Sequence, residues 1–287
     1  MPSDISVSGL AWVVMTEDKA QVDLCGAPQT MLATLYAKAL DADLPDPILG
    51  DRFAKQAVER IAYDWRKTTI TAKRSPSVTT RSAHFDAWAR RFLTANSDAV
   101  VLHLGCGLDA RYFRLAPGPG VDWYDVDYPD VTELRRRLLP AAEHNHVVAA
   151  SVTDPAWLAE IPAGRPTLMI GEGLTMYLTE SDGVALLRRI VERFPNGELH
   201  FDVFNRLGIK TQWSNAVVRR SGARLHWAIN GPGDILTAVP GTRLLEWVRW
   251  FESGTYERIP RAYRVLGAVM ALVPATANMS QYHRYGF

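Results

Sequence analysis

The stretch VVLHLGCGLDARYFRL, residues 100–115, decides the fold. It opens as a buried strand, and Gly105 and Gly107 follow that strand at once. Glycines at a strand-to-helix turn permit a tight bend and let a ligand lie against bare backbone. About 20 residues later a second apolar run ends in Asp125 and Asp127, where a carboxylate is placed to accept hydrogen bonds from ribose hydroxyls. The pattern predicts an α/β fold with an adenosine-binding sheet edge.

Further strand candidates alternate with helical stretches on both sides of this motif. Apolar runs of this kind, separated by amphipathic helices such as 181–193 (capped by Ser181), indicate a parallel sheet covered on both faces. Two later runs around a helix at 259–273 complete a predicted seven-stranded, mostly parallel sheet. The predicted strands are AVVLHL (99–104), VDWYDV (121–126), HVVAA (146–150), PTLMIG (166–171), ELHFDVF (198–204), TRLLEWVRW (242–250) and SQYHRYGF (280–287).

The chain divides into zones without a linker between them. Residues 1–95 are predicted to form an N-terminal helical cap segment, because their apolar residues follow a helical period from about residue 29. Residues 96–287 are predicted to form the ligand-binding core, with an insertion at about 206–240, the whole being one compact unit. We expect both caps to cover the carboxyl ends of the strands, where open α/β sheets bind ligands.

Composition excludes several classes of protein. The 287 residues carry 32 Lys and Arg against 31 Asp and Glu, a formal charge of +1, which makes nucleic acid an unlikely partner. The two cysteines, Cys25 and Cys106, have neither disulfide-framework nor zinc-ligand spacing. Residues 1–14 lack the features of a signal peptide, and no apolar run reaches the ~20 residues that span a bilayer. We expect a cytoplasmic protein without membrane contact.

Two classes of cofactor compete for the glycine turn. A dinucleotide fold favours a third glycine at position 110, where this chain has Ala110. Asp109 would then direct a negative charge into the phosphate zone, where the helix dipole favours an anion. An adenosyl cofactor without phosphates removes that conflict. The motif therefore favours a methyl donor over NAD(P), although an NAD(P)-dependent oxidoreductase remains an alternative.

A set of motifs in order makes the identification specific. LGCGLDARYFRL followed by WYDVDYPDV resembles the leucine carboxyl methyltransferase family, and is closer to its bacterial branch of polyketide O-methyltransferases. Other matching segments, in the family's order, are TLYAKALD (34–41), RSAHFD (81–86), SVTDPAWL (151–158), GEGLTMYL (171–178) and the terminal HRYGF. The resemblance implies a Rossmann-like class I methyltransferase fold and S-adenosyl-L-methionine as cofactor, leaving S-adenosyl-L-homocysteine as product.

The resemblance also implies cofactor contacts, position by position. Arg81 would grip the carboxylate of the cofactor's methionine part, a bidentate task that suits a guanidinium. Asp127 would hold the ribose, with Asp125 as the adjacent family acid. The other implied contacts are Gly105 and Gly107 beside the amino-acid portion, Lys38 near the cofactor carboxylate, and Glu172 near the ammonium or at the substrate edge.

One departure from the family pattern concerns adenine. The family has an Asp-Leu pair where this chain has Ser151-Val152, and that acid accepts a hydrogen bond from the adenine amino group. Ser151 is also an acceptor, though neutral and shorter. Asp154, three residues on, is a candidate to compensate. The departure concerns the adenine contact and not the identity of the cofactor.

Structural roles compete with each of these assignments. A charged residue at a helix start or strand end is often a solvated or capping group, and a histidine in a buried strand is usually hydrogen-bonded core. The competing assignments are a surface residue for Arg81, a helix cap for Asp127, solvated charges for Glu172 and Lys38, a local ion pair for Asp109 with Arg111, and a core histidine for His103.

The reaction class follows from the chemistry of the acceptor. A carboxylate is already ionised at pH 7 and needs no general base, whereas a phenol, with a pKa of about 10, profits from one. The sequence shows neither a dedicated acid–base pair nor a metal constellation, which favours a carboxylate over a phenolic or hydroxyl acceptor. Glu172 and Tyr177, which follow the fourth strand, are the candidate catalytic residues.

The insertion at 206–240 is predicted to determine the acceptor. Aromatic side chains with arginine suit a planar or carboxylate-bearing molecule. The acceptor would be a small secondary metabolite, such as a polyketide, or a peptide C-terminus, and the enzyme a monomer or homodimer without a metal. A catalytically silent cofactor-binding protein is a further alternative. The candidate substrate residues are Trp213, Arg220, His226 and Trp227.

Overall fold

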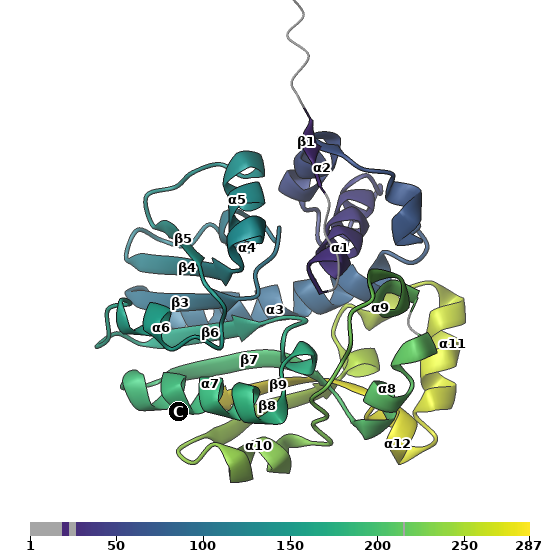
Figure 1. The fold of residues 1–287 in the computed structure, drawn as a ribbon. Coiled ribbons are helices and arrows are strands. Elements are labelled where there is room, and N and C mark those ends of the chain that lie inside the picture. Colours follow the sequence, from purple (N-terminus) through teal and green to yellow (C-terminus); the bar gives the residue numbers. More distant parts are fainter. Residues whose placement is uncertain (1–18, 23–26, 215) are drawn as a thin grey trace, which may run out of the picture.

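A seven-stranded sheet runs through the computed structural model, which describes residues 19–22, 27–214 and 216–287 (Figure 1). The strand order is β5-β4-β3-β6-β7-β9-β8, parallel from β5 to β7 and antiparallel at β9 and β8. The seven predicted strands are confirmed, each to within one residue at either end. They are β3 (Ala99–Leu104), β4 (Val121–Asp127), β5 (Asn145–Ala149), β6 (Thr167–Gly171), β7 (Gly197–Phe204), β8 (Arg243–Arg249) and β9 (Ser280–Gly286).

The topology explains where a ligand can bind. From β3 the chain moves outward through β4 to β5, and it then returns to pair β6 with the other side of β3. This reversal opens a crevice at the carboxyl ends of β3 and β6, which is the binding position in open α/β sheets. The glycine turn 105–107 lies at that crevice.

Helices cover both faces of the sheet because alternate residues of the central strand point to opposite sides. Ala99 and Val101 pack with Phe85 and Trp88 of α3 (Pro76–Ala95). Val100, Leu102 and Leu104 pack in the cluster that holds α7 (Glu180–Arg193) and α10 (Pro232–Ala238). β3 is therefore buried on both faces, as its continuous apolar run predicts.

A cap lies beside the sheet, at the carboxyl ends of its strands (Figure 1). In it α1 contacts both α2 and α9, and the short β1 pairs in parallel with β2. The cap elements are β1 (Ala20–Gln21), α1 (Ala27–Ala42), α2 (Arg52–Glu59), β2 (Ile61–Ala62), α8 (Arg206–Lys210), α9 (Ala216–Ser221), α11 (Arg261–Met270) and α12 (Pro274–Ala277). The remaining helices are α4 (Arg111–Leu115), α5 (Pro129–Leu138) and α6 (Ala156–Ala159), with short 3₁₀ turns at 65–68, 175–177, 212–214, 250–252 and 256–258.

The structure corrects the predicted zones in three respects. The boundary at residue 95 is wrong, because α3 lines the crevice at its start and then packs along the sheet. The insertion 206–240 caps the crevice only to about residue 224, since Trp227, Ile229 and Ile235 belong to the core cluster of the sheet. α11 and α12, which were not expected in the cap, contribute to it instead.

Two helix boundaries also differ from the predictions. The N-cap of α7 is Thr179 and not Ser181, because the Thr179 hydroxyl accepts the backbone N–H of Asp182. The helix predicted at 259–273 is α11, which begins after Pro260 and ends at Met270. Residues 1–14 and Cys25, on which the signal-peptide and cysteine predictions depend in part, lie outside the described residues. Over the described ranges, no helix has the length and apolarity needed to cross a membrane.

Candidate active site

A cavity of about 860 Å³ opens at the carboxyl ends of the parallel strands, under the cap. One wall is the sheet edge, formed by the residues that follow β3, β4, β5 and β6. The other walls are helical, and they come from α1, α3, α9 and α11. Its lining includes Lys38, Arg81, Gly105, Gly107, Asp127, Val152, Glu172 and Tyr177 from the predicted set.

The glycine turn has a backbone that only glycine adopts without strain. Gly105 and Gly107 have φ of +59° and +52°, in the left-handed region. A Cβ on Gly107 would lie 2.9 Å from Cγ of Met31, and one on Gly105 would lie 3.0 Å from Leu174. Both positions therefore need glycine for backbone and for space, and their bare backbone fits a ligand that lies close to the turn.

Asp127 fixes this turn to the end of β4. Its Oδ2 accepts the backbone N–H of Gly107 at 2.7 Å, and its Oδ1 accepts that of Tyr128 at 2.8 Å. Burial raises the pKa of the carboxyl, against the effect of these N–H donors. No side chain caps α5, so the helix-cap assignment for Asp127 is not borne out. The carboxylate lines the cavity at the position predicted for a ribose contact.

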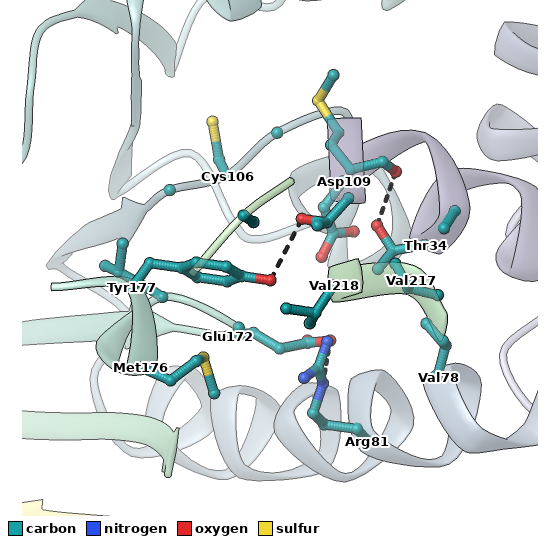
Figure 2. A pocket seen from close by; sticks show the side chains of 18 of the residues that line it. Thr34, Val78, Arg81, Cys106, Asp109, Glu172, Met176, Tyr177, Val217 and Val218 are labelled. Carbon is teal, nitrogen blue, oxygen red and sulfur yellow. Dashed lines mark hydrogen bonds and ion pairs between the residues drawn. The ribbon is translucent and has the colours of Figure 1, made fainter. Parts of the chain in front are cut away.

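Arg81 is held by two carboxylates, of which Figure 2 shows that of Glu172. It projects from α3 toward Glu172 at the end of β6, and its Nε donates to Oε1 of Glu172 at 3.0 Å. Its Nη1 donates to Oδ2 of Asp202 in β7 at 2.7 Å. Arg81 is thus no free surface residue. Asp202 was missed by sequence reasoning, and its only signal is a carboxylate inside the buried strand ELHFDVF.

Glu172 is a fixed, ionised group. Besides Arg81 it accepts hydrogen bonds from Arg111 and from the Ser82 hydroxyl, the latter at 2.8 Å. Burial opposes ionisation, but the charges of Arg111 and Arg81 outweigh it and lower the pKa of the carboxyl. The solvated-charge assignment is therefore wrong. A carboxylate with so low a proton affinity orients its neighbours and is a poor general base.

Asp109 and Lys38 form part of the same network. Lys38 Nζ lies 3.0 Å from Oδ2 of Asp109, and Arg114 lies 2.8 Å from Oδ1. Arg111 is 3.4 Å from the same carboxylate, so the expected local ion pair of Asp109 with Arg111 is confirmed. Burial alone would raise the pKa of Asp109, but Arg114 and Lys38 lower it. The alternative that Lys38 is a solvated surface charge is wrong, since its side chain is buried.

His103 and Asp125 are structural. His103 is 2% exposed, and its Nδ1 lies 2.7 Å from Oδ1 of Asp125. Burial would raise the pKa of Asp125, but Arg135 and His103 lower it to about 2. The prediction of a hydrogen-bonded core histidine is confirmed. Asp125 does not reach the cavity lining, so Asp127 is the acid of this pair that a ligand meets.

The segment after β5 brings Ala150 and Val152 to the cavity, but not Ser151. The Ser151 hydroxyl lies 2.8 Å from that of Thr153 and also accepts the Thr153 N–H. Asp154 is exposed, accepts the N–H of Ala156 at the start of α6 and is not part of the cavity lining. An adenine contact by Ser151 stays a prediction.

Tyr177 reaches the cavity from the turn after β6 (Figure 2). Its hydroxyl lies 3.5 Å from the Thr30 hydroxyl of α1. Burial raises the pKa of the phenol, so the hydroxyl stays protonated at neutral pH and can donate a hydrogen bond. Its catalytic role stays a prediction.

The four predicted substrate residues do not line the cavity. The prediction that Trp227 contacts the substrate is wrong. Trp227 is 5% exposed and packs in the core against α7, because the chain has left the cap before this residue. His226 is exposed and is tied by its backbone N–H to Met176, while Trp213 is 69% exposed. Arg220 donates to the carbonyl of Lys67 at 3.3 Å, outside the lining.

Sequence reasoning missed most of the apolar residues that line the cavity. They share no motif: some lie on cap segments, whereas Phe204 ends β7, Tyr282 is in β9 and Met176 is in the turn after β6. Methionines are prominent, and their flexible thioethers adapt to varied shapes. The missed lining residues include Ile70, Val78, Met176, Phe204, Val217, Val218, Trp250, Met270, Met279 and Tyr282.

The residues present fit an adenosyl cofactor without phosphates. The glycine turn offers bare backbone and Asp127 offers a carboxylate, while Lys38 and Arg114 beside the turn are already paired with Asp109 and are not available to a pyrophosphate. Over the described residues, no group of three or more His, Cys, Asp or Glu is arranged to hold a metal ion.

Comparison with known proteins agrees with this geometry. Residues 30–191 match the family model for leucine carboxyl methyltransferase. The chain is 39% identical to the tetracenomycin polyketide synthesis O-methyltransferase TcmP of Streptomyces glaucescens, over 93% of this chain and 98% of that protein. It is 37% identical to the S-adenosyl-L-methionine-dependent methyltransferase dpfgK of Gibberella zeae, over 85% of this chain and 88% of that protein.

Solved structures show the same fold. A putative methyltransferase from Thermobifida fusca superposes with a TM-score of 0.61 at 18% identity, covering 91% of this chain and 94% of that one. With the motif order, the site geometry and the relatives in accord, the chain belongs to the leucine carboxyl methyltransferase family and is an S-adenosyl-L-methionine-dependent O-methyltransferase.

Proposed function

We propose that this enzyme methylates a carboxylate oxygen of a small molecule with a large apolar or aromatic body. The observation that carries the proposal is the pairing of three candidate groups: Glu172 lies between Arg81 and Arg111, and Asp109 lies between Lys38 and Arg114, so both stay ionised, while burial keeps Tyr177 protonated. None of these groups suits proton abstraction at neutral pH. A carboxylate acceptor needs none, because it is already ionised.

The lining of the cavity supports an acceptor with an apolar body. The cavity of about 860 Å³ has to hold the cofactor, along the sheet edge, as well as the acceptor, against the helical walls. Aromatic and methionine side chains such as Trp250, Met270 and Met279 line the helical walls. The name of the relative TcmP refers to polyketide synthesis, which agrees with an acceptor of this kind.

The cofactor is expected to lie along the sheet edge. Asp127 would accept hydrogen bonds from the ribose, and the glycine turn would border the amino-acid portion. Arg81 would meet the cofactor's carboxylate with Nη2, since Nε and Nη1 already donate to Glu172 and Asp202. S-adenosyl-L-methionine supplies an electrophilic methyl group on a sulfonium. The chain's task is then to hold donor and acceptor close and to exclude water.

The stoichiometry separates the two acceptor classes. With a carboxylate, a carbon–oxygen bond forms, the carbon–sulfur bond breaks, and the electron pair returns to sulfur. The products are a neutral ester and S-adenosyl-L-homocysteine, and no proton is released in the transfer. A phenol instead releases one proton for each methyl group.

The test is a panel of polycyclic aromatic acids, the matching phenols, and peptides with a free C-terminus. Products are identified by mass spectrometry, and proton release is followed in a weakly buffered assay. We expect methyl esters of the aromatic acids, formed without proton release during transfer. Methyl ethers with one proton released would replace the proposal by hydroxyl methylation, and methylated peptides would move it to a peptide C-terminus.

A further inference from the structure

Exposed cations gather on two cap segments. Residues 67–74 contain three lysines or arginines and residues 219–224 contain three more, and neither segment contains an aspartate or glutamate. The whole chain carries a formal charge of only +1, so the charge is concentrated locally. We call these six exposed residues the basic rim: Lys67, Lys73, Arg74, Arg219, Arg220 and Arg224.

The basic rim borders the cavity on two sides. Arg224 is itself a lining residue, and its neighbours Val217 and Val218 line the wall that α9 forms. Ile70 lies within the other cationic segment and Val78 follows it, and both line the cavity. The two segments meet where Arg220 Nη1 donates to the carbonyl of Lys67 at 3.3 Å.

The charges of the basic rim are not neutralised by carboxylates of the described residues. The partners that the structure shows are carbonyl oxygens: Arg74 donates to Thr69 and Arg219 to Trp213. A carbonyl satisfies a hydrogen bond but leaves the positive charge in place. By contrast, the cations deeper in the cavity, Lys38 and Arg81, are paired with carboxylates. The available positive field therefore lies at the rim.

We propose that the basic rim selects an anionic aromatic acceptor, one whose body fills the apolar walls while a second acidic group stays at the rim. This inference rests on the proposed function, since it names the acceptor class of the same cavity. Like charges around a cleft with apolar walls focus the field and raise the local concentration of an oppositely charged ligand. The second acidic group keeps its charge during transfer, because only the oxygen near the cofactor is methylated.

The field acts oppositely on the two substrates. S-adenosyl-L-methionine carries a net charge of about +1 at neutral pH, from its sulfonium with its carboxylate and ammonium balanced. At 0.1 M salt, the interaction between exposed charges that lie more than about 10 Å apart is largely screened. Added salt should thus weaken binding of an anionic acceptor without weakening that of the cofactor. This contrast provides a control within one preparation.

The test compares two fluorescent probes of nearly the same shape. Anilinonaphthalene sulfonate is an aromatic anion, and phenylnaphthylamine is its neutral parent. Both are titrated into the full-length enzyme saturated with S-adenosyl-L-homocysteine, at about 20 and 500 mM salt. The variant is Lys73→Glu with Arg224→Glu, one cation from each side. Arg137→Glu with Arg243→Glu is the matched control, because both are exposed and outside the lining.

We expect the anionic probe to bind roughly tenfold more weakly to the rim variant than to the wild type, with a smaller salt dependence. The neutral probe and the matched control should keep wild-type affinities. Equal losses in the rim variant and the matched control would reduce the effect to net charge and overturn the proposal. So would equal losses for both probes, or no loss for either.

Val78→Trp locates the probe, because Val78 lines the cavity and the larger ring fills it. We expect this variant to lose binding of both probes. Binding of the anion that survives Val78→Trp would place it outside the cavity and overturn the proposal. The methyltransferase assignment would stand in each of these cases, since it is tested separately by cofactor binding and by product analysis.

Discussion

Arg81 is oriented by charge more than by packing. Its guanidinium lies between Glu172, which follows β6, and Asp202 on β7, and those carboxylates fix the direction of its remaining nitrogen. The free energy of such charge-assisted hydrogen bonds is about 1.5–3 kcal/mol each. A residue held in this way keeps its geometry before the cofactor arrives, so little rotamer entropy is lost on binding.

The first prediction concerns Arg81 and Asp127. Arg81→Ala and Asp127→Ala should each weaken S-adenosyl-L-homocysteine binding by about 1.5–3 kcal/mol, roughly 10- to 150-fold in Kd. Each change removes a charged partner from the sheet edge. Isothermal titration calorimetry measures the effect, and Arg90→Ala on the exposed side of α3 is the control. Wild-type affinity in either variant would refute its cofactor role.

The same calorimetry tests the choice of cofactor. The wild-type enzyme should bind S-adenosyl-L-homocysteine and not NADH, because the cations beside the glycine turn, Lys38 and Arg114, are already paired with Asp109 and offer no unpaired charge to a pyrophosphate. Tight binding of NADH alone would contradict the assignment.

Residues with local motifs were predictable, and those without were not. Gly107 and Asp127 occur at the ends of adjacent buried strands, where spacing alone brings them together. Asp202 is distant in sequence, and only the pairing of β6 with β7 places it beside Arg81. Trp227 was assigned to the substrate because an aromatic residue near arginines resembles a binding surface. Its burial depends on a path over α7 that no local pattern encodes.

At the scale of elements, α7 and the segment after the cap are joined by one close contact. A Cβ on Gly183 of α7 would lie 2.0 Å from Cζ3 of Trp227, so the indole rests directly on the helix backbone. Glycine inside a helix costs about 1 kcal/mol relative to alanine. This cost is offset by packing, because a side chain at position 183 would displace the indole of Trp227 from the core.

The second prediction follows from this contact. Gly183→Ala should lower the free energy of unfolding by about 1–3 kcal/mol, since overpacking against Trp227 exceeds the gain in helix propensity. Gly233→Ala in α10 is the matched control, because a Cβ there meets nothing within 4 Å and the change should be neutral or stabilising. Urea denaturation measures both. Equal stability of the two variants would refute the packing argument.

Helices and strands were predictable where a run of buried residues leaves a continuous apolar pattern in the sequence. β3 and β6 are buried throughout, and their bounds were predicted to within one residue. β1 and β2 have two residues each, too short for any periodicity to register. The segment 225–240 was misassigned because an amphipathic stretch packs equally well on a cap or on a sheet, and tertiary contacts alone decide between them.

At the scale of the whole molecule, buried histidines connect stability to pH. His283 in β9 is fully buried, and burial lowers its pKa from 6.5 to about 3. Burial likewise lowers the pKa of His84 in α3 to about 4. Both are neutral in the folded protein at pH 5, whereas in the unfolded chain they titrate near 6.5. Below pH 6.5 the unfolded state therefore binds protons that the folded state does not.

The third prediction is a loss of stability in mild acid. The free energy of unfolding should be steady above pH 6.5 and should fall as the pH drops toward 4, with His283 alone contributing about 2–3 kcal/mol at pH 4.5. Urea denaturation at several pH values measures the slope. The Nε2 of His84 is buried without a hydrogen-bond partner. His84→Phe removes this titrating imidazole, so the free energy of unfolding should depend less steeply on pH. Unchanged stability between pH 7.5 and 4.5 would contradict the prediction.

The cavity has walls of two separate origins, and this has a consequence for how such enzymes diverge. On the proposed assignment, the donor side is built mainly from the turns that follow parallel strands, joined by Lys38 of α1 and Arg81 of α3, whereas the acceptor side is built from other residues of the helices. Mutations in the helices alter what is accepted and leave the donor turns intact. After gene duplication, one copy can therefore change its acceptor specificity while it continues to bind the cofactor. The same separation lets an engineer recombine cap segments between relatives while keeping one sheet.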